Sequence, residues 1–202
     1  MKTAIAVLVS GSGTNLQSII DKTESGYIPA EIKCVISNRE DAFGLKRAEN
    51  HNIPNYYVDS KKFDSRDEHE RGIINILKKH DIELVVLAGY MRLLTSNILN
   101  EYKNRVINIH PAILPSFPGT DGYGDAWEYG VKVSGCTVHF VDEGCDTGPI
   151  ILQRVNEIKE GESLEDFKKR GLEIEHEAFP LAIKLYCEGK LKIEGRKVSV
   201  LG

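Results

Sequence analysis

The sequence is poor in cysteine, and its cysteines suggest neither a cross-link nor a metal. The four cysteines, Cys34, Cys136, Cys145 and Cys187, include no C-x-x-C pair. Their spacing fits neither a zinc site nor a disulfide framework. No cluster of histidine, cysteine and acidic residues has the spacing of metal ligands. We therefore expect reduced, buried thiols and no bound metal.

The amino terminus lacks a long hydrophobic segment of the kind found in targeting peptides and membrane spans. The opening "MKTAIAVLVSGSGTN" has a short apolar run that glycines and polar residues end. The run is too short to cross a bilayer and precedes no small-residue cleavage site. We expect a cytoplasmic protein without a membrane partner.

Positive charge is not in excess either. The 202 residues carry a net charge of −4, with a pI of about 5.9. A protein that binds nucleic acid usually has a basic surface, so we expect no nucleic-acid partner. A small anionic ligand needs only local positive potential and remains open.

The first half of the chain alternates apolar runs with helical patterns. Near-continuous apolar runs at 3–9, 31–36 and 82–88 are typical of strands buried on both faces in a parallel sheet. Residues 65–80 have helical periodicity, with acids early and bases late. Residues 14–25 also suit a helix, for which Thr14 and Gln17 predict a capping box. The pattern predicts an α/β, Rossmann-like, doubly wound and mostly parallel sheet.

The second half differs in composition. Four of the seven prolines and seven of the eighteen glycines fall between residues 111 and 149. The segment "GCTVHFVD" at 135–142 alternates like a strand, and a further strand, the added antiparallel one, follows at 149–158. We expect a long helix over about 163–188 and a terminal hairpin over 190–201. No linker is apparent, which favours one domain or two closely packed halves.

A glycine-rich turn, "SGSGTNLQ", follows the first apolar run. Gly11 and Gly13 permit a tight turn, and backbone N–H groups at the start of the next helix would favour an anion such as phosphate. A lone G-x-G is weak, because the turn lacks the third glycine of a dinucleotide fingerprint and the lysine of a P-loop. An ordinary strand-to-helix turn is the alternative.

The stretch "NIHPAILPSFPG" at 108–119 places an amide and an imidazole at a strand end. Asn108 and His110 are two residues apart and point to one side of a strand. Asn can donate to a developing oxyanion, and His can transfer protons near neutral pH. Asp146, in an acid- and glycine-rich loop, would orient His110 and raise its pKa. The alternative is a satisfied polar pair. No nucleophile is evident, because Ser116 lies in no G-x-S-x-G elbow, so the attacking group would belong to a substrate.

Four blocks of sequence carry a family resemblance. "SGSGTNLQ", "LAGYMRLL", "NIHPAILPSFPG" and "SGCTVHFVDEGCDTGPIILQ" resemble the glycinamide ribonucleotide transformylases, or phosphoribosylglycinamide formyltransferases, in the order of that family. The resemblance implies a single formyltransferase domain over 1–202, with a nucleotide-binding half (1–108) and a folate-binding, catalytic half (109–202). It also implies formyl transfer from 10-formyltetrahydrofolate to the amine of glycinamide ribonucleotide in purine biosynthesis. Asn108 and His110 would stabilise the oxyanion, and Asp146 would hold His110.

The resemblance extends to binding residues. Nucleotide contacts would come from Gly13, Thr14, Asn15 and Glu175. Folate contacts would come from Arg66, from the apolar wall Met91, Arg92, Leu93 and Leu94, and from the loop residues Asp142, Glu143, Gly144 and Cys145. Without the resemblance, Met91–Leu94 would be taken as core, Arg66 as a solvated helix start and Glu175 as a surface acid.

One stretch departs from the family pattern. After "FPG" many members have a His-containing stretch, whereas this chain has Asp121 and Tyr123 in "TDGYGDAW". The family also implies a cis peptide bond at Leu114-Pro115.

Three alternatives remain open. A methionyl-tRNA formyltransferase would need a further domain and an RNA-facing surface. A formyltetrahydrofolate hydrolase would use water as the acceptor and normally has an N-terminal regulatory domain. A non-catalytic nucleotide-binding module would explain the glycine turn but not the Asn-His-Asp set. The oligomeric state is not fixed by the sequence, and a homodimer is compatible with it.

Overall fold

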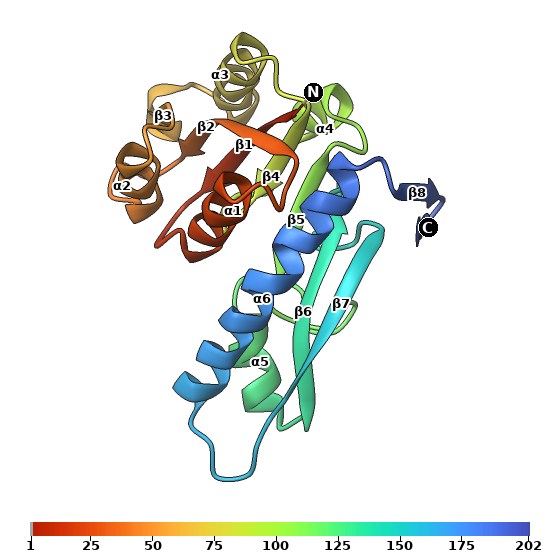
Figure 1. Cartoon of the computed structure of the whole chain (residues 1–202). Helices are drawn as coiled ribbons and strands as arrows, with labels where there is room; N and C mark the ends of the chain where they lie inside the picture. Colours follow the sequence, from red (N-terminus) through yellow and green to blue (C-terminus); the bar gives the residue numbers. More distant parts are fainter. Residues whose placement is uncertain (1) are drawn as a thin grey trace. The chain divides into compact units, whose positions relative to one another are not determined.

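The computed structural model describes residues 2–202, which divide into two compact units. The first unit ends at Ile107 and the second is Asn108–Gly202. The sequence predicted a boundary between the two halves after residue 108. The boundary between the two units, after Ile107, lies in the same strand, β5 (Val106–His110). Neighbouring strands follow the order β3-β2-β1-β4 in the first unit (Figure 1) and β6-β7-β9-β8 in the second. The parallel pairing of the strands in the first half confirms the predicted α/β class.

Parallel strands form the core of the first unit. They are β1 (Thr3–Val9), β2 (Ala30–Ser37), β3 (Asn55–Tyr57) and β4 (Leu84–Leu87). β1 pairs in parallel with both β2 and β4, and β2 pairs in parallel with β3. Ile5–Val9 are completely buried, as the unbroken apolar run predicted. The chain order reverses between β1 and β4, which is where ligands bind in open α/β sheets.

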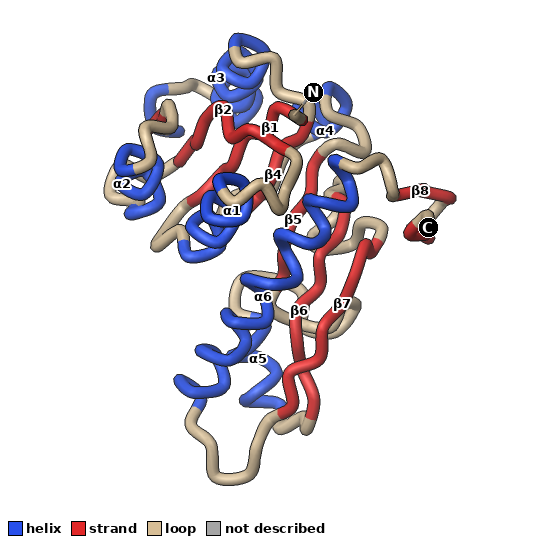
Figure 2. Tube along the Cα trace, in the orientation of Figure 1, coloured by secondary structure: helices blue, strands red, loops and turns tan. Residues whose placement is uncertain are grey.

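Helices of the first unit pack in two groups. They are α1 (Thr14–Glu24), α2 (Phe43–Asn50), the short 3₁₀-helix η1 (Ser60–Lys62), α3 (Arg66–Lys79) and α4 (Ser96–Glu101). α1 packs on α2, and α3 packs on η1 and α4. Figure 2 shows these helices around the strands of the unit.

The predicted capping box of α1 is wrong. The N-cap is Gly13, in the left-handed region with φ 69°, and no side chain caps the helix. Thr14 is already helical, so its hydroxyl is past the capping position. α3 does have a side-chain cap, because Ser65 accepts from the Glu68 N–H.

Antiparallel pairing characterises the second unit. Its strands are β6 (Val133–Phe140), β7 (Ile150–Glu157), β8 (Leu191–Glu194) and β9 (Lys197–Val200). β6 pairs with β7 and β8 with β9 in antiparallel fashion, while β7 and β9 are parallel at Ile150 and Lys197. The predicted antiparallel strand is therefore joined by a terminal hairpin. Both faces of β6 are buried from Ser134 to Phe140, although its sequence alternates.

Two helices complete the second unit. α6 (Leu164–Cys187) matches the predicted long helix, and α5 (Gly122–Tyr129) was not predicted. α6 packs on β6 and β7, and α5 packs on α6, beside its first half (Figure 1). Within residues 2–202, every helix falls short of the length and apolarity needed to cross a membrane.

Candidate active site

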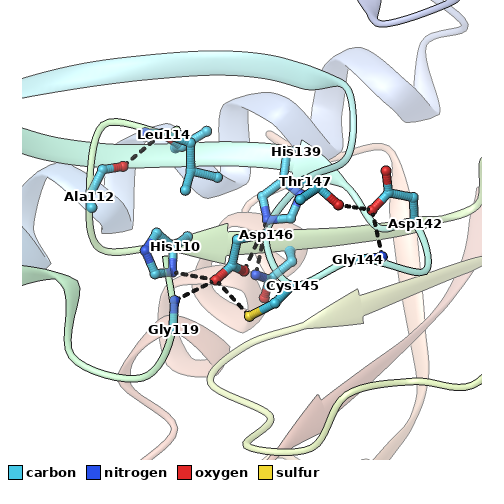
Figure 3. A network of polar contacts seen from close by, with 12 residues as sticks. His110, Ala112, Leu114, Gly119, His139, Asp142, Gly144, Cys145, Asp146 and Thr147 are labelled. Carbon is cyan, nitrogen blue, oxygen red and sulfur yellow. Dashed lines mark hydrogen bonds and ion pairs between the residues drawn. The ribbon is translucent and has the colours of Figure 1, made fainter. Parts of the chain in front are cut away.

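The end of β5 presents the predicted amide and imidazole. Asn108 is partly exposed and His110 is 2% exposed. His110 Nε2 lies 2.7 Å from the Phe117 carbonyl oxygen, and its Nδ1 lies 3.4 Å from Asp146 Oδ2. Each ring nitrogen thus faces an oxygen atom, to which it donates when it carries a proton. The predicted pairing of His110 with Asp146 is present in the structure (Figure 3).

A second histidine, which the sequence did not single out, joins this cluster. His139 Nδ1 lies 2.8 Å from the Phe140 carbonyl, to which it donates. Its Nε2 lies 3.2 Å from the Asn108 amide nitrogen and 3.7 Å from Asp146 Oδ1. His139 therefore fixes the orientation of the Asn108 amide. We call Asn108, His110, His139 and Asp146 the polar cluster.

Asp146 is held as a carboxylate. Burial favours its neutral form, but contacts with His139, the Gly119 N–H and the charge of His110 outweigh burial and hold the pKa at about 2. The Gly119 N–H donates to Asp146 Oδ2 at 2.9 Å. The Asp146 backbone has φ 55°, a conformation that Asp adopts more readily than most residues.

The proline-rich loop after β5 is anchored to β6 and β7. Thr137 Oγ1 donates to the Ala112 carbonyl at 2.7 Å and accepts from the Leu114 N–H at 3.0 Å. Gln153 Nε2 donates to both Thr137 Oγ1 and the Leu114 carbonyl. The Leu114-Pro115 peptide is cis, as predicted. These contacts fix the chain that runs from His110 towards Phe117.

The glycine turn of the first unit is shaped by a close approach to α2. A side chain at Gly13 would place its Cβ 2.7 Å from Gly44 Cα, and the positive φ disfavours one as well. Gly44 N–H donates to the Gly11 carbonyl, and Arg47 donates from Nε to the Ser12 carbonyl. The predicted phosphate residues Gly13, Thr14 and Asn15 therefore lie in a defined turn at the start of α1.

The segment after β4 begins beside this turn. Ser10 N–H donates to the Gly89 carbonyl, and Ser10 Oγ accepts from the Met91 N–H at 2.8 Å. The structure thus brings the predicted phosphate turn and the predicted folate wall to one edge of the sheet, at the reversal point between β1 and β4. Met91 and Leu93 are 60% and 57% exposed, so their apolar side chains are accessible to solvent.

Other members of the predicted wall have structural partners. Leu94 is buried and belongs to the core. Arg66 donates to the Leu93 carbonyl, and Arg92 donates to Ser60 Oγ at 3.2 Å. Arg66 is exposed at the start of α3 and has this contact with the segment after β4.

The loop before Asp146 is closed by its own side chains. Asp142 Oδ1 accepts from the Gly144 N–H at 3.2 Å and from Thr147 Oγ1 at 2.6 Å (Figure 3). Glu143 and Cys145 are exposed. Cys145 and the half-buried Cys187 depart from the expectation of buried thiols, whereas Cys34 and Cys136 agree with it, and within residues 2–202 none of the four forms a disulfide.

The stretch that departs from the family pattern forms α5. Asp121 caps the helix by accepting from the Gly124 N–H and pairs with Lys168 Nζ at 2.9 Å. Tyr123 is buried, 5% exposed. Glu175, on α6, is also buried, so it is not a surface acid. This buried carboxylate is the kind of group that requires partners.

Comparison with known proteins identifies the family. The formyl transferase family model matches residues 3–183. The chain belongs to the formyl transferase family. Within this family it is 44% identical to the phosphoribosylglycinamide formyltransferase of Haemophilus influenzae, over 94% of the chain and 90% of that relative.

Longer family members contain a similar segment. The chain is 40% identical over 95% of its length to the trifunctional purine biosynthetic protein adenosine-3 of Gallus gallus, of which it spans 19%. A segment similar to this chain therefore occurs within a much longer protein.

Solved structures of formyl transferases agree with the fold. Glycinamide ribonucleotide transformylase 1 from Symbiobacterium toebii has a TM-score of 0.97 and 46% identity, covering 100% of this chain and 95% of that one. A formyltetrahydrofolate deformylase from Pseudomonas syringae has a TM-score of 0.91 and 30% identity, covering 100% of this chain and 67% of that one. The fold alone therefore does not decide the formyl acceptor.

Proposed function

We propose that this chain transfers the formyl group of 10-formyltetrahydrofolate to the amine of glycinamide ribonucleotide, a step of purine biosynthesis. The amine attacks the formyl carbon, a tetrahedral intermediate forms, and tetrahydrofolate leaves as its nitrogen takes a proton. The observation that carries this proposal is the polar cluster, which combines an amide donor, an imidazole and a carboxylate held by hydrogen bonds.

Asn108 and His110 are the proposed oxyanion donors. Asn108 uses one amide N–H to contact His139 and retains a second N–H for the developing negative charge. His110 can donate from Nε2 once its contact with the Phe117 carbonyl is exchanged for substrate. Phe117 has φ 53°, an unfavourable conformation for an aromatic residue, and this strain assists the exchange.

Asp146 has an electrostatic role in this scheme. Its carboxylate, with a pKa of about 2, remains negative throughout the neutral range and stabilises a positively charged His110. The charged imidazole can then give a proton to the leaving nitrogen and recover one from the attacking amine.

Substrate binding is proposed from the remaining predicted residues. The turn at Gly13, Thr14 and Asn15 would hold the phosphate through backbone N–H groups and the positive end of α1. Glu175 would meet the sugar or amine end of the nucleotide. The exposed apolar side chains of Met91 and Leu93 suit a pterin face, and the loop Asp142–Cys145 would contribute backbone contacts to the folate.

Cellular setting and assembly follow the same proposal. We propose a cytoplasmic enzyme that acts on small molecules, without nucleic-acid or membrane partners. A homodimer remains compatible with the chain, and sedimentation would decide it.

Hydrolysis of formyltetrahydrofolate is the second candidate, because the deformylase fold is so similar. A hydrolase has no need of a phosphate-binding turn. The closely packed turn around Gly13 therefore favours a phosphorylated acceptor over water.

The test is formyl transfer with purified protein, omitting glycinamide ribonucleotide or 10-formyltetrahydrofolate in turn. Tetrahydrofolate release that requires the nucleotide is the expected result. Release without the nucleotide would identify a hydrolase. Nucleotide binding without any release would identify a binding module and contradict the proposed mechanism.

A further inference from the structure

A buried phenol joins the two helices of the second unit. Tyr123 of α5 is 5% exposed, and its ring packs edge-on against Phe167 of α6, with centroids 5.4 Å apart. Asp121 and Lys168 form an ion pair between the same helices. α5 and α6 are therefore tied at two points, within the stretch that departs from the family pattern.

The phenol fits only because α6 has a glycine opposite it. A Cβ at Gly171 would lie 2.4 Å from Tyr123 Cζ and 2.6 Å from its Oη. Apart from proline, glycine is the least favourable residue in a helix interior, so its presence here calls for a packing reason. The Tyr123 side chain provides that reason, and the two residues form a matched pair.

The same face of α6 carries a buried carboxylate. Glu175 follows Gly171 by four residues, so both lie on one face of the helix, and Glu175 is 4% exposed. Burial raises the pKa of the Tyr123 phenol, and the negative charge of Glu175 raises it further. The phenol hydroxyl and the carboxylate are thus electrostatic neighbours.

The hydroxyl of Tyr123 has a charged neighbour. The Glu175 carboxylate acts on it both through its negative charge and through a side-chain hydrogen bond. A buried hydroxyl needs such a partner to offset its loss of water. A phenylalanine would fill the same space, so the contribution of the hydroxyl is its contact with this carboxylate.

We propose that Tyr123 is a positioning residue that sets the Glu175 carboxylate for the nucleotide. This inference rests on the proposed function, in which Glu175 meets the sugar or amine end of glycinamide ribonucleotide. The phenol O–H donates to one carboxylate oxygen of Glu175, and the carboxylate held in this way directs its other oxygen to the substrate. Tyr123 thereby takes part in nucleotide affinity without touching the formyl group.

The experiment uses Tyr123→Phe, which removes the hydroxyl and keeps the ring. Tyr129→Phe is the matched control, because Tyr129 lies on the same helix and is 79% exposed. The readouts are kcat, the KM values for glycinamide ribonucleotide and for 10-formyltetrahydrofolate, and calorimetric binding of the nucleotide. Thermal unfolding verifies that both variants fold.

The expected result for Tyr123→Phe is a KM and a Kd for the nucleotide raised about tenfold, as for a lost hydrogen bond to a charged group. The folate KM and kcat should stay within about twofold, because binding before and during reaction is weakened equally. Tyr129→Phe should match wild type. Glu175→Gln should largely abolish the effect of Tyr123→Phe, because the phenol acts through the carboxylate.

The other outcomes distinguish a failure of this inference from a failure of the proposed function. Nucleotide affinity unchanged in Tyr123→Phe would overturn this inference and leave the proposed function standing. A parallel rise of both KM values would indicate a merely structural role and overturn it too. Wild-type protein that binds the nucleotide but transfers no formyl group would overturn the proposed function, and the calorimetric comparison would still decide the role of Tyr123. Wild-type protein that does not bind the nucleotide would overturn both.

Discussion

The glycine turn after β1 and the polar cluster at the end of β5 are built from different parts of the chain. The turn uses backbone: Gly13 has a positive φ and nearly touches Gly44. The cluster uses side chains: His139 orients Asn108, and Asp146 faces His110. A backbone site depends on shape, whereas a side-chain site depends on charge and on proton positions. Substitutions in the two regions should therefore fail in different ways.

The largest expected effect is a loss of turnover in the polar cluster that leaves nucleotide binding at the glycine turn intact. His110→Ala should lower kcat by about 10⁴-fold, the upper range for a lost acid–base group, while nucleotide binding survives. Steady-state turnover and calorimetry measure the two quantities. His51→Ala, which removes a histidine from the first unit, is the control. Turnover preserved in His110→Ala would refute the catalytic assignment of the cluster.

A second effect tests how the cluster is organised. Asn108→Ala should lower kcat about 100- to 1,000-fold, as for one oxyanion donor. His139→Ala should lower kcat less, because the Asn108 amide loses its orientation but keeps its N–H groups. In the Asn108→Ala background the His139 substitution should have little further effect. Fully additive losses would show that His139 acts independently of Asn108.

A third effect tests the shape of the turn. Gly13→Ala should destabilise the protein by about 2 to 4 kcal/mol, combining left-handed strain with overpacking, and should weaken nucleotide binding. Gly26→Ala is the matched control, because Gly26 has φ 77° and open space around its Cβ position. Urea denaturation gives the stability difference. Equal effects of the two substitutions would mean that the contact with Gly44 is unimportant.

The smallest effect concerns acid stability. The pKa of Asp146 is lowered from 3.8 to about 2, so its carboxylate stabilises the folded state above about pH 4. This stabilisation is lost as the pH falls towards 2, and amounts to about 2 kcal/mol at neutral pH. Asp146→Asn should lack this part of the acid-induced loss, measured by urea denaturation between pH 7 and pH 3. Identical pH slopes for the two proteins would contradict it.

Regular patterns predicted the framework better than its details. Long apolar runs identified β1, β2 and β4, and charge and periodicity identified α3 and α6. The short elements α2, β3, α4 and α5 were missed, because three to eight residues carry little periodic signal. The capping box at Thr14 failed because a glycine with positive φ took the capping position.

The types of the residues in the sequence were enough to predict most of the polar cluster. The remaining residue, His139, is explained only by the neighbouring strand. Asn108, His110 and Asp146 stood out because their chemistry is rare beside a buried strand. His139 did not, because its partner Asn108 lies on another strand. The signal was present as a histidine in an apolar strand that precedes the Asp146 loop. The burial of Glu175 was equally invisible, because it depends on the elements that pack against α6, namely α5, β6 and β7.

The hydroxyl of Thr137 has a consequence for how the site tolerates mutation elsewhere. It serves three partners, the Ala112 carbonyl, the Leu114 N–H and Gln153, and Gln153 is its register partner on β7. Slipping β6 by one residue would turn Thr137 to the opposite face and release the loop that leads from His110. The position of the loop thus depends on the pairing of β6 with β7. Substitutions that weaken this pairing away from the site should lower catalytic activity without altering any residue that contacts substrate.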